Sequence, residues 1–300
     1  FRSNQERIVV GTMYKQVSAF EAQKHGAALV AANIARHIQN HVMNLPKTWR
    51  PLVYCWRGGK RSGSLALVLG QIGFKVWLIE GGYKAFRAEV VKDVAQIAPR
   101  LRFQVVAGPT GSGKTRLLHA LQAQGAQVLD LEALAQHRSS VLGRIPGQAQ
   151  PSQKHFDMRV WHQLRQFDPN RTVFVEAESK KVGNVSIQEE LVQAMRSSQC
   201  IDLQLSQAER VALLLEDYAF FAQDPALFCQ RLSVLTAQKG KVLIGQWQDM
   251  VRAGQTPAVV SALLEQHYDP TYAKSVERNF TGFGQAHVAA LPDRHPNSMA

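Results

Sequence analysis

The sequence predicts an α/β protein of two domains, and three observations support this. The chain has 300 residues, which is long for one compact domain and comfortable for two. Short apolar runs alternate with helical segments and glycine turns, a spacing typical of strands that pair in parallel. A new strand, a glycine-rich loop and a helix begin just after Pro99. We therefore place one domain at residues 1–98, a second at 99–285 with a helical C-terminal region, and a loose tail at 286–300.

The first domain is predicted to alternate helices with strands. Residues 16–42 are alanine-rich and lack proline, which favours a helix, and Pro46 and Pro51 end that pattern. After the prolines we expect a strand at 52–55, a helix opening at 64–69, a strand at 75–79 and a helix at 88–100. Strand, helix and strand at this spacing imply parallel pairing.

The second domain is predicted to begin with a strand at residues 103–107. We expect a helix at 114–124 and further core strands at 128–130 and 172–176, because these runs are short and apolar. Residues 144–155 are rich in Gly, Pro and Gln and are predicted to form a loop. From residue 186 onward the apolar residues fall mostly at helical spacing.

Composition limits the classes of protein. No run of 18 uninterrupted apolar residues exists, so no membrane span is expected, and no signal peptide is recognisable. Three cysteines without a CxxC pair argue against a disulfide framework and a structural zinc site, which fits a reducing cytoplasm. Because the chain begins with Phe1 rather than Met, we expect it to start inside a longer protein.

Positive charge is concentrated in the first third of the chain. The net charge is +12, and residues 1–98 hold fourteen Lys or Arg against five Asp or Glu. A basic domain indicates a polyanionic partner such as RNA, or several anionic substrates. The alternative is charge that serves only solubility.

Cys55 lies in a loop suited to anion chemistry. The loop follows the strand at 52–55 and leads into a helix, whose N-terminal end favours negative charge. Its cations and the helix end favour a thiolate at Cys55, which makes Cys55 the candidate nucleophile. The alternative is a buried cysteine that ends a strand. The candidate anion-binding residues of this loop are Arg57, Gly58, Gly59, Lys60, Arg61 and Ser62. Cys200 and Cys229 lack such surroundings and are expected to be packing residues.

A second loop matches the phosphate-binding pattern G-x-x-x-x-G-K-[ST] without exception. It follows a predicted strand and opens a predicted helix, which is the context that the pattern requires. Its backbone N–H groups would wrap a phosphate, Lys114 would neutralise terminal phosphates, and Thr115 can hold a magnesium ion. The candidate phosphate-binding residues are Gly108, Gly111, Ser112, Gly113, Lys114 and Thr115.

Carboxylates at strand ends are candidates to complete a metal site beside this loop. Glu176 and Glu178 end the strand that starts at Thr172, and Asp130 ends the strand at Val128. In proteins with such loops, an acidic residue at the end of another core strand holds the magnesium ion. The alternative for each is a solvated strand end, and the sequence leaves the metal undetermined.

Several further segments, in order along residues 8–280, make the chain resemble one family. They are Gly11-Thr12-Met13-Tyr14-Lys15-Gln16, Glu80-Gly81-Gly82-Tyr83-Lys84-Ala85, Asp130-Leu131-Glu132 with His137-Arg138-Ser139-Ser140, Glu176 to Ser179, and His267 to Tyr272. Together with the two loops, they resemble the bacterial tRNA 2-selenouridine synthases. The resemblance implies a rhodanese-like α/β domain followed by a P-loop NTPase-like α/β domain with a helical C-terminal part.

The chain departs from that family's pattern in two places. The D-V-R strand and the H/M-P-x-A-x-N-L segment that begin the family's first domain are not found, so the resemblance predicts that the first part of this domain is missing. Ser139 stands where the family has glycine in H-R-G-S. A serine is strained there if the backbone φ is positive.

The resemblance implies a two-step reaction on tRNA. Such enzymes first alkylate wobble 2-thiouridine with a geranyl group from geranyl diphosphate, and selenophosphate then supplies selenium while the geranylthio group leaves. Cys55 would be the nucleophile of the selenium step, and the phosphate loop would hold a diphosphate or phosphate. His137 and Arg138 would contact phosphate or transfer protons, unless they are an exposed pair at a helix end. Glu132 joins the candidate acidic partners.

The partners and cofactors follow from the same resemblance. We expect tRNA as the macromolecular partner, a selenophosphate-supplying enzyme as a further candidate partner, no membrane, and no tightly bound cofactor apart from a candidate Mg²⁺. Two other hypotheses stay open. A sulfurtransferase fused to an ATP-dependent kinase would use the same two loops and turn over ATP. A non-enzymatic RNA-binding or regulatory protein would have decayed sites, against which intact Cys55, Lys114 and Thr115 count.

Overall fold

The computed structural model describes residues 3–56, 59–138, 140, 142–143, 147–295 and 298. The chain divides into two compact units, residues 1–89 and 90–300. The division falls inside helix α4 (Gly82–Ile97), and not at residue 98 where the sequence places it. The last turns of α4 belong to the second unit because Val94 is fully buried in its main core, as is Ala98 directly after the helix.

The first unit consists of helices around a short parallel sheet. Its elements in chain order are α1 (Asn4–Gln16), α2 (Ala19–His37), η1 (Ile38–Val42), β1 (Leu52–Val53), α3 (Lys60–Ile72), β2 (Trp77–Leu78) and the start of α4. The two strands pair in parallel, Leu52 with Trp77 and Val53 with Leu78, as the strand–helix–strand spacing predicts. A small core of Val42, Val53 and Leu69 lies between the helices and the strands.

The helices of this unit do not begin where the sequence predicts. The predicted helix at 16–42 is found as α2 and η1, but a separate helix, α1, precedes it. Ser3 and Glu6 form a capping box at the start of α1, and the Ser18 hydroxyl caps α2 after the break. Helix α3 opens at Lys60 rather than Ser64, directly after Gly59 with φ 71°.

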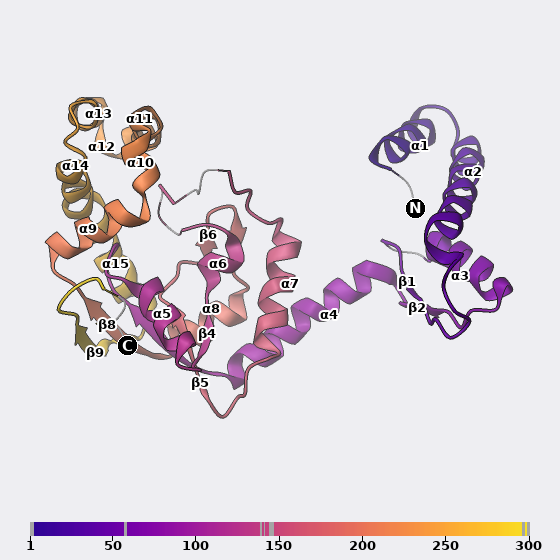
Figure 1. The fold of residues 1–300 in the computed structure, drawn as a ribbon, viewed down its shortest axis with the longest axis horizontal. Coiled ribbons are helices and arrows are strands. Elements are labelled where there is room, and N and C mark those ends of the chain that lie inside the picture. Colours follow the sequence, from indigo (N-terminus) through magenta and orange to yellow (C-terminus); the bar gives the residue numbers. More distant parts are fainter. Residues whose placement is uncertain are drawn as a thin grey trace. The chain divides into compact units, whose positions relative to one another are not determined.

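The second unit holds a larger parallel sheet with helices on both faces (Figure 1). Its strands are β3 (Arg102–Ala107), β4 (Gln127–Leu129), β5 (Thr172–Glu176), β6 (Lys181–Val182), β7 (Val185–Ser186), β8 (Gln199–Gln204) and β9 (Gly282–Ala290). Its helices are η2 (Ala98–Arg100), α5 (Lys114–Ala123), α6 (Leu131–Ala135), α7 (Gln153–Leu164), α8 (Glu189–Arg196), α9 (Gln207–Asp217), α10 (Ala219–Gln223), α11 (Pro225–Leu232), η3 (Ser233–Leu235), α12 (Thr236–Lys239), α13 (Lys241–Arg252), α14 (Thr256–Leu263), η4 (Leu264–Tyr268) and α15 (Asp269–Asn279).

The five main strands are ordered β4-β5-β3-β8-β9, and every neighbouring pair is parallel. Strand β3 is therefore central, and its carboxyl end opens into the loop that leads to α5. Ligands of open parallel sheets bind at the carboxyl ends of the strands, where the order of the strands reverses. The topology thus places the phosphate-loop pattern at the position where this fold class binds ligands.

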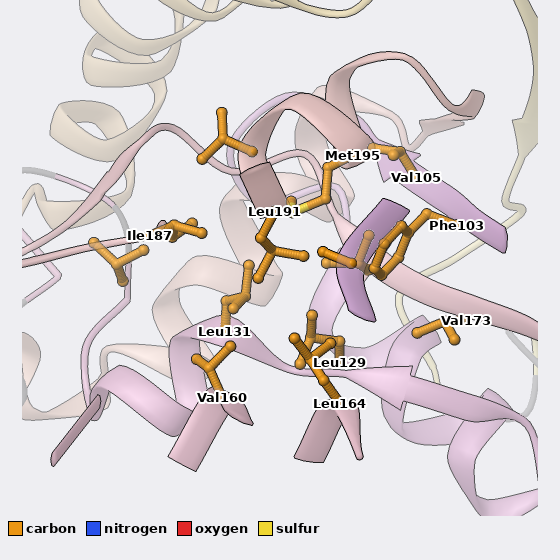
Figure 2. Packing of buried hydrophobic residues seen from close by; sticks show 14 of the residues in the cluster. Phe103, Val105, Leu129, Leu131, Val160, Leu164, Val173, Ile187, Leu191 and Met195 are labelled. Atoms are coloured by element: carbon orange, nitrogen blue, oxygen red, sulfur yellow. The ribbon is translucent and has the colours of Figure 1, made fainter. Parts of the chain in front are cut away.

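Alternate residues of each strand point to opposite faces of the sheet and pack into different core clusters. On one face, Phe103 and Val105 of β3 and Val173 of β5 pack with Leu164 and Leu191 in the largest core cluster (Figure 2). On the other face, a smaller cluster joins the strands to α5 through Val106, Leu118, Val128 and Leu203. This alternation of period two is what a sheet covered on both sides requires.

Helices α9 to α14 form a separate group beyond the sheet (Figure 1). Their shared core includes Phe228, Leu232, Trp247, Val259 and Leu263. The sequence predicts this helical part, and the structure confirms it.

Two strands of the sheet were not predicted. Strand β8 lies in the region expected to be helical, and β9 overlaps the predicted loose tail at 286–300. The tail prediction is wrong for residues 286–290, because β9 pairs with β8, Asp202 opposite Val288 among others. Beyond the strand, the Arg294 side chain binds Glu209 at 2.9 Å and Glu216 at 2.7 Å. An edge strand with few buried side chains leaves little apolar pattern in the sequence.

Among the described residues, no helix is long and apolar enough to cross a membrane.

The main core predicts a large effect of one buried leucine. Leu191 of α8 is 0% exposed, whereas Val242 of α13 is 78% exposed. We expect Leu191→Ala to lower the free energy of unfolding by about 2–5 kcal/mol, since it removes buried carbon and leaves a cavity. Val242→Ala, the control, is expected to change it by less than about 0.5 kcal/mol. Urea denaturation followed by circular dichroism measures both, and equal effects would contradict this account of the core.

Candidate active site

The phosphate loop connects β3 to α5 in a conformation that depends on its glycines. Gly111 has φ 79° and Gly113 has φ 89°, values that residues with a Cβ rarely adopt. A Cβ on Gly108 would come within 2.5 Å of the Ser112 hydroxyl and 2.6 Å of the Leu203 carbonyl oxygen. Ser112 itself is fully buried, and its hydroxyl has no hydrogen-bond partner among the described residues.

Lys114 folds back over the loop. Its Nζ donates hydrogen bonds to the carbonyl oxygens of Gly108 at 2.8 Å and Pro109 at 3.3 Å. These two carbonyl oxygens accept hydrogen bonds from the ammonium group within the loop. A phosphate in the loop would offer stronger, charged acceptors to the same group.

Three side chains that the sequence analysis did not assign to the site hold this loop in place. Arg210 of α9 donates to the Thr110 carbonyl oxygen from Nε at 2.9 Å and from Nη2 at 2.8 Å. The same guanidinium binds Asp269 through two hydrogen bonds of 2.5 and 3.0 Å. The Tyr272 hydroxyl accepts the Gly108 N–H at 2.5 Å.

Two of these three side chains belong to a segment that the sequence had marked without a role. Asp269 and Tyr272 lie in the His267–Tyr272 segment, which the sequence marks only as part of the family resemblance. Both contact the phosphate loop or its arginine, so the segment supports the loop. No sequence pattern predicts the contact of Arg210 with the loop, because its partner Thr110 lies a hundred residues earlier in the chain.

A group of three carboxylates, two of them buried, lies beside the loop. Ligand oxygens of Glu132, Glu176 and Glu178 lie within 4.8 Å of one another. Glu176 and Glu178 are only 4% and 5% exposed. The Thr115 hydroxyl donates to Glu176 Oε1 at 2.6 Å, which joins this group to the phosphate loop. Carboxylate and hydroxyl oxygens are the donors that Mg²⁺ prefers.

Glu176 has an unusual protonation equilibrium. Burial, followed by repulsion from Glu132, raises its pKa to about 8, against the opposing effects of Lys114 and the Thr115 hydrogen bond. A carboxyl with this pKa carries a proton through most of the neutral range. A divalent cation in the carboxylate group would instead favour the ionised form.

The remaining sequence candidates of the second unit lie around α6. Asp130 caps that helix, accepting the Ala133 N–H at 2.8 Å and contacting His119 at 3.1 Å. Asp130 is therefore used as a helix cap and is not part of the carboxylate group. Arg138 donates to the Asp217 carbonyl oxygen at 2.8 Å and lies 4.6 Å from the Tyr218 ring centre. His137 donates its backbone N–H to the Glu132 carbonyl oxygen at 3.1 Å.

The Cys55 loop lies in the first unit, at the end of β1. Cys55 is 7% exposed, and the Ser62 hydroxyl donates to its sulfur at 3.4 Å. Burial alone would raise the pKa of the thiol. Hydrogen bonds from Ser62 and from the Gly59 backbone, together with the charge of Arg61, outweigh burial and lower the pKa below its ordinary value. Lys60, Arg61 and Ser62 form the first turn of α3, while Arg57 and Gly58 lie outside the described residues.

The start of α4 fixes the backbone of this loop. The N–H groups of Tyr83 and Lys84 donate to the carbonyl oxygens of Cys55 at 2.8 Å and Trp56 at 3.0 Å. Gly82, with φ 64°, allows this approach, because a Cβ there would lie 2.3 Å from the Cys55 oxygen. The Trp56 and Tyr83 rings stack at 5.3 Å. The Glu80–Ala85 segment of the sequence is thus a structural partner of the cysteine loop.

Comparison with known proteins decides the family. A family model described as the tRNA 2-selenouridine synthase AAA domain matches residues 101–233. A tRNA 2-selenouridine synthase of Pseudomonas fluorescens is 31% identical across 98% of this chain and 88% of its own length. One from Aeromonas salmonicida is 32% identical across 90% of this chain and 79% of its own length. This chain belongs to the tRNA 2-selenouridine synthase family.

Coverage differs among the family members. A tRNA 2-selenouridine synthase of Nitrosomonas europaea is 35% identical over 72% of this chain, and the match spans only 57% of that relative. The chain thus matches little more than half the length of this relative. No solved structure matches the chain. The segment matched by the family model contains the phosphate loop and all three members of the carboxylate group.

The Cys55 environment predicts a change in thiol reactivity. Ser62→Ala removes the hydroxyl that donates to the sulfur, so the pKa of Cys55 should rise and its alkylation by iodoacetamide at neutral pH should slow. The rate is measured as a function of pH, with Cys55 identified by peptide mass spectrometry. Ser64→Ala is the matched control, since that hydroxyl binds the Lys60 carbonyl oxygen instead. An unchanged pH profile in Ser62→Ala would contradict the role of this hydrogen bond.

The raised pKa of Glu176 predicts how stability depends on pH. A carboxyl with a higher pKa in the folded state binds its proton more tightly there, so its contribution to stability is complete below about pH 4.5 and is lost as pH rises through about 8. In the absence of divalent cations, Glu176→Gln should therefore reduce the loss of stability between these values. Urea titrations over that range measure this, with the exposed Glu190→Gln as control. A wild-type curve parallel to that of Glu176→Gln would contradict the shift.

Proposed function

We propose that this chain is a tRNA 2-selenouridine synthase that replaces the sulfur of wobble 2-thiouridine with selenium through an S-geranyl intermediate. One observation carries the proposal. The phosphate loop is hydrogen-bonded through Thr115 to the carboxylate group, and the chain is similar to enzymes of that name. Its substrates would be the tRNA, geranyl diphosphate and selenophosphate.

The first step is transfer of the geranyl group. The sulfur of 2-thiouridine attacks the first carbon of geranyl diphosphate, a C–S bond forms, and the C–O bond breaks. The diphosphate leaves with the electron pair, and the base loses its N3 proton to solvent. A diphosphate leaving group develops negative charge, so fixed donors around it lower the barrier.

The phosphate loop supplies such donors. Lys114 and the loop N–H groups would bind the diphosphate, and Tyr272, Arg210 and Asp269 hold the loop that presents them. Glu132, Glu176, Glu178 and Thr115 would hold a Mg²⁺ ion, since all four offer oxygen donors close together. Bound there, Mg²⁺ would neutralise charge on the diphosphate.

The second step is the transfer of selenium. The Cys55 thiolate would attack the phosphorus of selenophosphate, so that an S–P bond forms and hydrogen selenide leaves with the electron pair of the broken P–Se bond. The selenide then attacks C2 of the base, and geranyl thiolate leaves. Water releases phosphate from the cysteine. No oxidant is needed, and the lowered pKa of Cys55 supports its role as the nucleophile.

The charge distribution supports tRNA as the macromolecular substrate. Residues 1–98 carry fourteen basic and five acidic side chains, and phosphate contacts of this kind give binding that weakens with salt. We place the reaction in the cytoplasm, with an enzyme that supplies selenophosphate as a further candidate partner.

Two substitutions separate the steps of the reaction. Lys114→Ala should slow geranylation by roughly a hundredfold, as expected for loss of a donor to a developing anion. Cys55→Ser should abolish formation of 2-selenouridine while S-geranyl-2-thiouridine still accumulates. The assay incubates 2-thiouridine tRNA with geranyl diphosphate, selenophosphate and protein, followed by mass spectrometry of the nucleosides.

The controls and alternatives are built into the same assay. Lys241→Ala changes an exposed lysine of α13 and should leave both products unchanged. Selenation by Cys55→Ser would show that the assigned nucleophile is wrong. If a cooperatively folded wild-type protein gives neither product but hydrolyses ATP, the kinase-fused sulfurtransferase is the better assignment.

A further inference from the structure

An open, apolar hollow lies among the helices of the second unit. It is bordered by α9, α10, α11 and α14, which cluster together in Figure 1, and by η4. Its apolar lining includes Leu214, Phe221, Phe228, Val260, Leu263 and Tyr268. Hydrocarbon surface of this extent is a binding surface for an apolar ligand or part of one.

The hollow begins at the phosphate loop. Thr110 belongs to that loop and also lines the hollow. On α9, Arg210 binds the Thr110 carbonyl oxygen, and Leu214 lines the hollow one turn later. The Leu214 side chain lies so close to the loop that a Cβ on Gly111 would come within 3.1 Å of it. A ligand with phosphates in the loop could therefore extend an apolar tail into the hollow.

The wall of the hollow suits an unsaturated hydrocarbon chain. Phe221 stacks on Phe228 at 4.7 Å and on Tyr218 at 5.8 Å, so aromatic faces form one side. The Tyr218 hydroxyl contacts the Ser140 hydroxyl at 3.4 Å. A nucleobase would need several placed donors and acceptors for recognition, whereas most of this lining is aliphatic or aromatic carbon.

We propose that this hollow is the subsite for the geranyl chain of geranyl diphosphate, with the diphosphate group held by the phosphate loop at its mouth. The identity of the ligand rests on the proposed function; the location of its chain rests on the continuity of hollow and loop through Thr110. Burial of the chain would add apolar binding energy that inorganic diphosphate cannot gain.

Val260 offers a test, because it is partly buried on α14 and lines the hollow. Val260→Phe should fill the hollow, weakening geranyl diphosphate binding by about tenfold or more, the equivalent of roughly two buried methylene groups. Inorganic diphosphate should bind this variant as it binds the wild type. Val260→Ala should enlarge the hollow and shift the preference from the ten-carbon geranyl toward the fifteen-carbon farnesyl diphosphate. Isothermal titration calorimetry with the three diphosphates measures these affinities, with the exposed Val242→Phe as control.

The outcomes separate the location from the function. If the wild type prefers geranyl diphosphate to inorganic diphosphate but both Val260 variants leave the chain-length preference unchanged, the subsite is wrong and the proposed function stands. If the wild type shows no preference for geranyl diphosphate, both are overturned. Retained binding of inorganic diphosphate shows that the variants keep a folded phosphate loop. If Val260→Phe no longer binds inorganic diphosphate, the chain-length preference of Val260→Ala alone tests the location of the subsite.

Discussion

The buried guanidinium of Arg210 connects the parts of the second unit that form its candidate site. One side of it binds the carbonyl oxygen of Thr110 in the phosphate loop, and the other binds the carboxylate of Asp269 at the start of α15. A charge that is only 7% exposed must be paired and fully hydrogen-bonded. The arginine therefore fixes the loop, α9 and α15 relative to one another. Tyr272, one turn further along α15, adds a second contact to the loop through the Gly108 N–H.

This arrangement explains why the C-terminal helices belong to the candidate site. The phosphate pattern itself spans only residues 108–115, but its geometry depends on residues 210, 269 and 272. The same helix that supplies Arg210 supplies Leu214 to the apolar hollow. Polar and apolar parts of one ligand can thus be recognised by successive turns of one helix, because residues four apart lie on the same face.

The two candidate sites control charge by different means. At Cys55, hydrogen bonds and the nearby Arg61 favour the anion more than burial disfavours it. At Glu176, burial and neighbouring carboxylates disfavour the anion more than Lys114 and Thr115 favour it. The first environment favours the thiolate of Cys55, and the second keeps a proton on Glu176 that a bound cation would displace.

The sequence by itself determined the motifs and the class of fold. The phosphate pattern, the cysteine loop and the parallel α/β order are local, because each depends on glycines, charges or apolar spacing within a few residues. The sequence could not show which of Asp130, Glu132, Glu176 and Glu178 converge, since that depends on how β4, β5 and α6 pack. It also missed β8 and β9, whose strand character comes from pairing with neighbouring strands of the sheet.

Only the tertiary structure decided the supports of the site. Arg210 and Thr110 are a hundred residues apart, as Gly108 and Tyr272 are 164 apart, and no local pattern records such contacts. Likewise, the sequence indicates that Gly81 and Gly82 form a turn, but only the fold shows that Gly82 makes room for the Cys55 carbonyl. The reactive groups of each loop depend on neighbouring residues in the sequence, whereas the residues that position each loop are brought together by packing.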